Sequence, residues 1–221
     1  MRVHQEKVPF DFILKKFVEM DPESISNALG VPYCDKEECF ELNLMGQDYK
    51  IIFPTGEVYN SNLDEVTSCV LKTILIRYLV NGKGTSLTNN YISYKEIQDG
   101  QVYYPNFYKR TILRLADIYN QDPASFLDKS NALDANILDK GDLSFSFDFM
   151  KNVNFQFILY DEDEEFEATA NILMDQNIED YFNAEDLAVV VDVAIEFFIH
   201  GEVPMDLGMY FTWSGKCPSL K

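Results

Sequence analysis

The sequence of 221 residues has only two histidines, His4 and His200. A triad hydrolase or a histidine-ligated metal site needs an imidazole beside a nucleophile or further ligands, so the chain is poorly equipped for either. His200 follows a long apolar stretch, and we interpret it as a residue at a helix C-terminus, with a ligand or base as the alternative. Motifs of phosphate-binding loops, serine hydrolases and zinc metalloproteases are absent from the sequence. We therefore predict no cofactor and no metal.

Basic residues are also scarce, with 18 Lys and Arg against 37 Asp and Glu and a formal net charge of −19. A surface that binds nucleic acid needs clustered cations, and an anionic membrane surface repels this charge. No stretch approaches the ~20 apolar residues of a membrane-spanning helix. We therefore expect no nucleic-acid partner and no membrane partner, and we interpret the charge as an aid to solubility.

The four cysteines are too few for a disulfide scaffold in a chain of this length. The N-terminal residues lead into a charged amphipathic segment rather than an apolar signal sequence. We therefore expect a cytoplasmic protein with free thiols. Cys34 and Cys39 are separated by four residues, and a four-cysteine metal site would require Cys69 and Cys217 to converge on them from distant segments.

The apolar residues alternate between helical and strand spacing along the chain. Helical patterns cover residues 10–18, 22–30, 63–80, 106–119, 123–131 and 184–199. Strict alternation predicts a hairpin from 40–44 and 49–53, a second from 143–149 and 153–159, and a third strand over 166–172. We therefore predict an α+β fold in which antiparallel hairpins form a sheet packed against several helices, as a single domain over residues 1–221.

The densest chemical feature is the acidic segment 161–167, which holds six carboxylates in seven residues. Alternate carboxylates on an extended chain point the same way and can gather a hard cation, although a solvated acidic turn explains the segment without a ligand. Metal binding would need help from other segments, of which Asp142 and Asp175 are the natural candidates. The acidic candidates for a ligand site are therefore Asp142, Asp163, Glu164, Glu165 and Asp175.

A group of aromatic residues surrounds the loop that follows the long helix at 63–80. Such tyrosines pack over the edge of a core or line a small-ligand pocket, and both interpretations stay open. We add Tyr78 and Tyr104 to the candidate ligand-binding residues. The C-terminal tail, residues 202–221, is apolar for a terminus, and we expect it to fold back on the body, with a protein interface as the alternative.

The order of these segments resembles the bacterial and archaeal family called domain of unknown function 3786 over residues 39–198. The resemblance is carried by residues 72–79, 92–97, 100–104, 107, 110, 141–142, 163–166 and 172–175. The chain departs from the family where a Gly-Gly pair is common, at residues 131–134, and where prolines are common, at residues 151–153. Some relatives resemble fusions with iron–sulfur modules, which this sequence lacks, so the resemblance implies a fold and acidic positions without an activity.

The sequence therefore supports two main hypotheses about function. The first is a non-catalytic accessory domain that binds a small molecule, a metal ion or a protein partner of unknown identity. The second is a small carboxylate-based enzyme, which could depend on Mg²⁺ and would use the acidic candidates as general acid, base or ligands.

Overall fold

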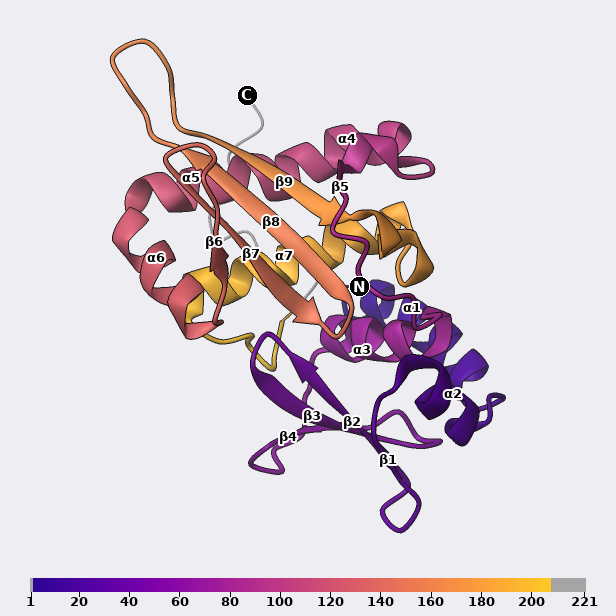
Figure 1. Ribbon diagram of the computed structural model, residues 1–221. Coiled ribbons are helices and arrows are strands. Elements are labelled where there is room, and N and C mark those ends of the chain that lie inside the picture. The colour runs from indigo at the N-terminus through magenta and orange to yellow at the C-terminus, as the bar shows by residue number, and fades with distance from the viewer. Residues whose placement is uncertain (1, 208–221) are drawn as a thin grey trace.

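The computed structural model describes residues 2–207 and contains two separate antiparallel sheets (Figure 1). The first, sheet A, has the order β1-β2-β3-β4 and comprises β1 (Tyr33–Cys34), β2 (Cys39–Leu44), β3 (Gln47–Ile52) and β4 (Val58–Asn60). The second, sheet B, has the order β5-β9-β8-β7-β6 and comprises β5 (Tyr91–Ser93), β6 (Asn136–Ile137), β7 (Leu143–Met150), β8 (Val153–Tyr160) and β9 (Thr169–Asp175). The α+β class and both predicted hairpins are confirmed, but the hairpins belong to different sheets.

In sequence, the helices lie at the ends of the chain, between the two sheets, and between β5 and β6 of sheet B. They are α1 (Arg2–Phe17), α2 (Pro22–Leu29), α3 (Cys69–Asn81), α4 (Gly100–Phe107), α5 (Leu113–Gln121), α6 (Pro123–Ala132) and α7 (Ala184–His200), with 3-10 turns at Tyr94–Glu96 and Gln176–Asp180. A π-helical turn, Tyr108–Ile112, joins α4 to α5. The helix predicted at 106–119 is therefore part of a longer helical run over residues 100–121.

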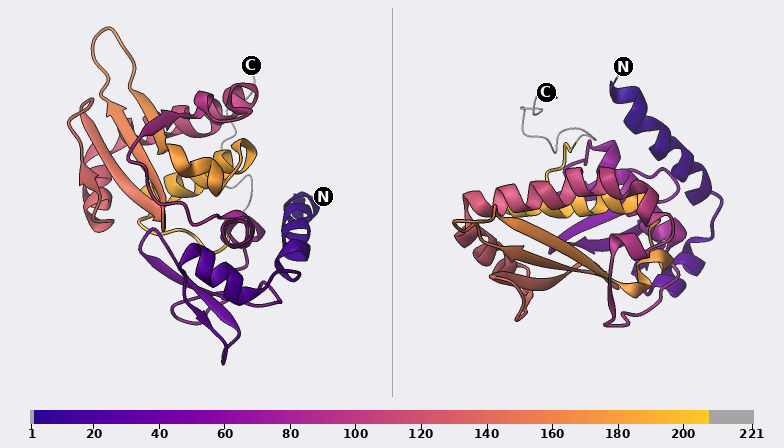
Figure 2. Two further views of the ribbon diagram at one scale, coloured as in Figure 1. Left: turned by 45° about the vertical axis from the view of Figure 1, so that its right-hand side comes forward. Right: turned by 90° about the horizontal axis from the view of Figure 1, so that it is seen from above.

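Sheet B packs one face against α7 (Figure 2). Strict alternation along β7 and β8 places Phe145, Phe147 and Phe157 on that face, and the ring of Phe198 on α7 lies 5.2–5.5 Å from each of them. The helix begins at Asn183, whose side chain accepts a hydrogen bond from the Asp186 amide, and ends at Gly201 in the left-handed conformation. The predicted boundaries and deep burial of this helix are confirmed.

The long helix predicted from Leu63 begins only at Cys69, where Ser68 is the N-cap. The side chain of Asn60 accepts hydrogen bonds from the Asn62 and Asp64 amides, so the preceding residues form a tight loop instead of a helical turn. The third strand of sheet B also starts later than predicted, at Thr169, because the Asp163 carboxylate accepts from the amides of Glu165 and Phe166 and holds a turn there.

Ion pairs join α7 to the helices beside it. Asp192, fully buried, accepts hydrogen bonds from Arg110 at 2.5 Å and from Arg114 at 2.7 Å. Glu196 accepts from Arg114 and lies 3.1 Å from His200 Nε2. The position of His200 in the last turn of α7 agrees with the interpretation from the sequence.

One cluster of buried apolar residues includes members of both sheets and of α3 and α7. The single-domain organisation stays a prediction, which cooperative unfolding would test. In the C-terminal tail, Val203 and Leu207 are buried and Met205 packs on the core, while residues 208–221 lie outside the described residues. Within residues 2–207, no helix is both long and apolar enough to span a membrane.

Candidate functional site

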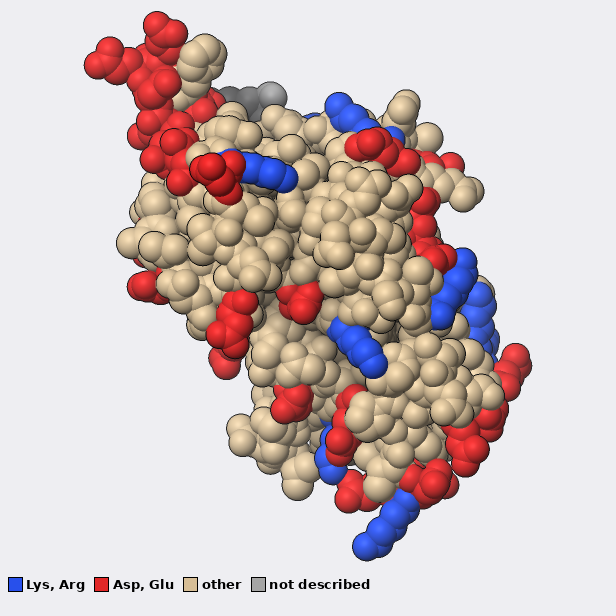
Figure 3. Space-filling model, viewed as in Figure 1, with Lys and Arg blue, Asp and Glu red and all other residues tan. Residues whose placement is uncertain are grey.

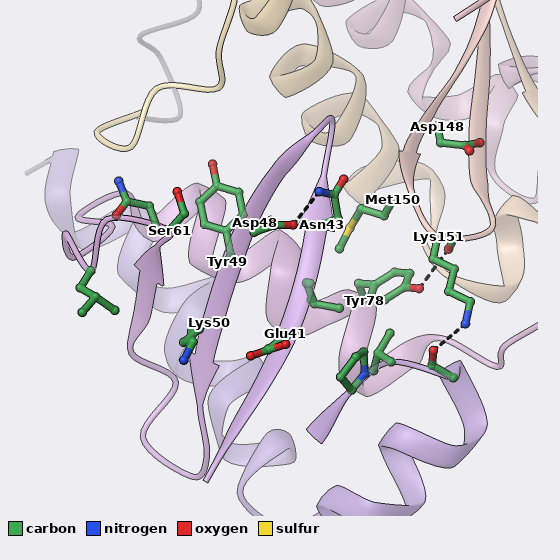
Figure 4. Close-up of a pocket in the computed structure, with 16 residues that line it drawn as sticks. Glu41, Asn43, Asp48, Tyr49, Lys50, Ser61, Tyr78, Asp148, Met150 and Lys151 are labelled. Atoms are coloured by element: carbon green, nitrogen blue, oxygen red, sulfur yellow. Dashed lines mark hydrogen bonds between the residues drawn. The ribbon is translucent and has the colours of Figure 1, made fainter. Parts of the chain in front are cut away.

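An open groove of about 770 Å³ lies between sheet A and the β7–β8 turn of sheet B (Figure 4). This volume falls within the usual range of ligand sites. Its lining residues come from the end of α2, from β2, β3 and β4, from α3 and from the β7–β8 turn. Residues far apart in sequence therefore meet here because the two sheets meet here.

Tyr78 and Lys151 build the side of the groove next to sheet B. Tyr78 is 1% exposed, its ring stacks on that of Tyr181 at 5.6 Å, and its hydroxyl donates to the Lys151 carbonyl at 3.0 Å. Burial raises the pKa of Tyr78, so the hydroxyl stays a neutral donor. The Lys151 ammonium donates to the carbonyl of Gly30 at 2.5 Å, where a cation suits the C-terminal end of α2. These bonds fix the β7–β8 turn against α2 and α3.

Polar side chains of β2 and β3 form the opposite side. Asn43 and Asp48 are partners across the two strands, and the Asn43 amide donates to the Asp48 carboxylate at 2.7 Å. The Lys50 ammonium forms an ion pair with the Glu37 carboxylate, with 2.6 Å between Nζ and Oε2. For the exposed carboxylate of Glu41, no hydrogen bond or ion pair is found within residues 2–207. Figure 3 shows acidic and basic side chains both present on this face, where the two sheets meet.

The outer edge of β2 has unused backbone groups. The Met45-Gly46 turn has positive φ at both residues, so Leu44 and Gln47 are the hydrogen-bonded pair that closes the hairpin. Hydrogen-bonded and non-hydrogen-bonded pairs alternate along an antiparallel ladder, so the backbone N–H and C=O groups of Glu41 and Asn43 point away from β3. In agreement, the Glu41 backbone amide donates to the Pro32 carbonyl at 3.1 Å.

Pro32 has no N–H to return this bond, and none of the described strands is paired with the outer edge of β2 at Asn43. The groove therefore presents the carbonyl of Glu41 and both backbone groups of Asn43.

Leu63 stands at the far end of the groove with its side chain 69% exposed. Its φ is +66°, a left-handed conformation that L-residues other than glycine, asparagine and aspartate rarely adopt. The Asn60 side chain imposes this conformation through its bonds to Asn62 and Asp64. An exposed apolar side chain on a strained backbone contributes little to folding, and such strain is often found at functional positions.

Tyr49 also lines the groove and is 1% exposed, yet within residues 2–207 its hydroxyl has no hydrogen-bond partner. Burial, reinforced by the negative charge of Glu202, raises the pKa of Tyr49 to about 12. A buried hydroxyl without a partner costs folding free energy, and a ligand or an ordered water could offset that cost by bonding to it.

Of the residues predicted from sequence, only Tyr78 lines the groove. Tyr104 lies elsewhere, half-buried on α4, with the Lys95 ammonium 4.0 Å from its ring centroid. Asp142, Asp163, Glu164 and Glu165 are all exposed. The loop that carries the last three protrudes between β8 and β9 (Figures 1 and 3).

The structure brings Asp142, but not Asp175, to the acidic segment. The Asp142 carboxylate accepts a hydrogen bond from the Asp161 amide at 2.9 Å, next to Leu159 at one end of β8. Asp175 ends β9 beyond Met174, which pairs with Phe155 near the other end of β8. The two carboxylates are separated by at least four residues of strand, which is ~13 Å. Within residues 2–207, no three His, Cys, Asp or Glu residues are arranged to hold a metal ion.

Asp175 has a structural environment of its own. Its fully buried carboxylate accepts hydrogen bonds from the Thr88 amide and hydroxyl and from the amides of Asn89 and Asn177, at 2.7–3.1 Å. Burial alone would raise the pKa of Asp175, but these hydrogen bonds outweigh it and the pKa lies below its usual value. Asp175 therefore fastens the loop between α3 and β5 to the end of β9.

Sequence reasoning missed most of the groove, including Asn43, Leu63, Asp148, Met150 and Lys151. The Lys151-Asn152 turn was visible as a hairpin connection, but nothing in the sequence showed that it meets β2. A polar stretch at 60–64 was the only local signal, because its asparagines and aspartate are typical of turns as well as of helix N-termini.

The fold and this site define the molecule as an α+β protein with an open groove between two antiparallel sheets. The chain belongs to the family described as a domain of unknown function, DUF3786, whose model matches residues 21–197. The resemblance seen in the sequence is thereby confirmed and begins earlier in the chain than residue 39. Comparison with curated proteins and with solved structures gives no match in either case.

Proposed function

We propose that this protein is a non-catalytic binding domain and that its ligand is an extended peptide segment of a partner protein, held in the groove between the sheets. The observation that carries the proposal is the unused edge of β2, where Glu41 and Asn43 present two carbonyls and one amide. An extended peptide offers the complementary pattern, because its own N–H and C=O groups alternate along the chain.

The side chains around this edge favour a particular kind of peptide. Val31, Leu42 and Met150 are buried apolar residues that line the groove and would contact an apolar anchor side chain. Glu41 and Asp148, both exposed, would attract a basic residue beside that anchor. We therefore infer a peptide with one apolar anchor flanked by Lys or Arg.

The carboxylate arrangement supports binding over the alternative of a carboxylate-based enzyme. The Asp148 carboxylate accepts a hydrogen bond from the side-chain amide of Asn154 at 2.7 Å, and the Asp48 carboxylate accepts one from the side-chain amide of Asn43 at 2.7 Å. Asp142 and Asp175 lie at opposite ends of β8, so these two do not act on one substrate atom. The proposal keeps the cytoplasmic location and the absence of nucleic-acid and membrane partners that the sequence suggests.

Selection from a library of extended peptides tests the proposal. We expect enriched sequences to share an apolar residue beside a basic one and to bind the wild type with micromolar affinity in fluorescence anisotropy. Leu63→Lys should weaken binding because it removes an apolar contact and places a positive charge at the groove, which repels a basic peptide. The matched control is Leu127→Lys, which alters an exposed leucine on α6 that does not line the groove; it should bind like wild type.

N-methylation of the peptide separates edge pairing from contact by side chains alone. Methylating the peptide amide that faces Asn43 should abolish binding, because it removes a donor, whereas methylating the next amide should have little effect. Equal binding to both leucine variants, or tolerance of every N-methyl group, would contradict the proposal.

A further inference from the structure

Two cysteines face each other at the end of sheet A. Cys34 on β1 and Cys39 on β2 are direct partners in the antiparallel register, joined by the loop 35–38, and both are free thiols. Direct antiparallel partners have Cα atoms ~4.5–5.5 Å apart, and their side chains project from the same face. Disulfides span Cα distances of ~4.4–6.8 Å, so the backbone spacing already suits a bond.

The two thiols differ in access. Cys39 is fully buried, whereas Cys34 is half-buried. An external oxidant would therefore reach Cys34 first, and Cys39 would be left as the neighbour that completes a bond. This division resembles the attacking and resolving roles that thiol–disulfide exchange requires.

An ion pair lies directly beside Cys39. Glu37 accepts a hydrogen bond from the Lys50 ammonium at 2.6 Å and lies 4.0 Å from the Cys39 sulfur. Burial raises the pKa of Cys39, the positive charge of Lys50 opposes that shift, and the negative charge of Glu37 reinforces it. Cys34 and Glu41 also face this thiol and raise the pKa slightly further. Beside the larger effect of burial, Lys50 favours and Glu37 disfavours the Cys39 thiolate that attacks a disulfide.

We propose that Cys34 and Cys39 form a reversible intramolecular disulfide by exchange with a low-molecular-weight disulfide, of which oxidised glutathione is the representative. Cys34 loses its proton, and its thiolate attacks one glutathione sulfur, forming a mixed disulfide and releasing the other glutathione as a thiolate. Cys39 then loses its proton and attacks the Cys34 sulfur, which forms the Cys34–Cys39 bond and releases the second glutathione. The two cysteines lose two electrons, and oxidised glutathione gains them.

The bond would staple β1 to β2 beside the groove. Cys39 and Glu41 are two residues apart on β2 and therefore project from the same face, and Lys50 is the cross-strand partner of Glu41. The site stands on the register and on the Glu37–Lys50 pair, and it does not depend on what the groove binds.

Glutathione buffers of defined ratio test the proposal on the full chain, with rapid alkylation and mass spectrometry of peptides. We expect oxidation to link Cys34 to Cys39 while Cys69 and Cys217 stay available for alkylation. Cys34→Ser, at the half-buried position, should leave Cys39 alkylated under the same buffer. Wild-type protein that stops at a Cys34–glutathione mixed disulfide, or that keeps four alkylated cysteines under oxidising buffer, would overturn the proposal.

Charge variants examine the resolving step without removing a cysteine. Glu37→Gln leaves the Lys50 charge unopposed, so the mixed disulfide should convert to the Cys34–Cys39 bond about threefold faster, because more of Cys39 is thiolate. Lys50→Met should slow the same step by about the same factor, and salt should reduce both effects. Equal rates in all three proteins would show that the ion pair does not act on Cys39 and would contradict the proposed resolving role.

Discussion

The half of the molecule around sheet A and the half around sheet B differ in how completely their buried polar groups are paired. Around sheet B, buried carboxylates are matched by cations or amides, as Asp192 is by Arg110 and Arg114. Around sheet A, the Tyr49 hydroxyl is buried without a partner within residues 2–207, and Leu63 keeps a positive φ. Groups that folding leaves unmatched are common at functional positions, so the difference between the halves supports the binding that we propose for the groove.

The contrast is not absolute. The Asn177 side-chain nitrogen donates to the carbonyls of Thr85 and Asn152, but within residues 2–207 its oxygen has no partner. Asp186 forms an ion pair with Arg77, although neither carboxylate oxygen has hydrogen-bond geometry. Both residues lie toward the end of sheet B that faces α3. Among the described residues of this half, buried side-chain oxygens without a hydrogen-bond partner therefore occur only near its boundary with the other half.

Asp192→Ala should give the largest loss of stability. It leaves the guanidinium groups of Arg110 and Arg114 partly buried without their shared carboxylate, which typically costs about 3–5 kcal/mol. Urea denaturation followed by far-UV circular dichroism measures the loss. Glu41→Ala, which removes an exposed carboxylate from the groove, is the control and should leave the midpoint almost unchanged.

Hydrogen exchange in the Asp192→Ala variant also tests the single-domain prediction. If the two sheets unfold as one unit, the slowest amides of β2 and β3 should lose as much protection as those of β7 and β8. Loss of protection confined to sheet B would instead show that the two halves unfold independently, and would contradict the single-domain prediction.

Asp175→Ala should give the next largest effect and should depend on pH. Removing a buried carboxylate with four donors should cost about 3 kcal/mol at neutral pH. Because the folded-state pKa of Asp175 is lowered, its contribution is complete above its unfolded value of 3.8 and is lost as pH falls through the folded value. The difference in unfolding free energy between wild type and variant should therefore shrink below about pH 4. A constant difference across this range would refute the assigned charge state.

The sheet B half was largely predictable from sequence, because its signals are local. Phe145, Phe147 and Phe149 alternate with polar residues, and Asn183 and Gly201 mark the ends of α7 in the positions that helix caps require. The start of α3 was not predictable from apolar spacing alone, because the side chain of Asn60 competes for the backbone amides of the expected first turn.

The groove depends on contacts that sequence patterns do not encode. Met45 donates to the Phe149 carbonyl at 3.0 Å, which joins the two sheets between residues more than a hundred positions apart. Tyr78 was a candidate ligand-binding residue and Lys151 only part of a turn, and nothing in the sequence placed the two together. Their meeting is set by how the sheets pack, which a single sequence read by periodicity cannot specify.

Two tyrosine variants should move stability in opposite directions across the groove. Tyr78→Phe should cost about 1 kcal/mol because the Lys151 carbonyl loses its donor, whereas Tyr49→Phe should be neutral or stabilising by about 1 kcal/mol because it removes a buried hydroxyl without a partner. Chemical denaturation of both variants at pH 7 measures the contrast. Equal destabilisation would show that Tyr49 has a bonding partner, such as a buried water.

The advantage of Tyr49→Phe should also grow in alkali. A folded-state pKa raised to about 12 means that the fold disfavours the phenolate, so wild-type stability is complete below the unfolded value of 10.0 and falls as pH rises toward 12. The phenylalanine variant lacks this loss at position 49. Parallel pH profiles above pH 10 would contradict the buried environment of the hydroxyl.

Leu63→Gly should give the smallest change in unfolding free energy. It is also the variant that most directly tests whether the groove contains backbone strain. A left-handed conformation costs an ordinary L-residue ~1–2 kcal/mol, and glycine avoids this cost. Glycine also loses ~0.5–1 kcal/mol of stability because its unfolded chain is more flexible, so we expect a net gain of about 0.5 kcal/mol. Because Leu63 is 69% exposed, little burial is lost. Leu127→Gly is the matched control and should lose about 1 kcal/mol of stability, since it places glycine within α6.

If Leu63→Gly is more stable than wild type but binds the selected peptides less tightly, Leu63 is a residue that serves binding at the expense of folding. If it is less stable, the Leu63 side chain contributes more to packing than its exposure indicates, and the groove loses its clearest sign of strain.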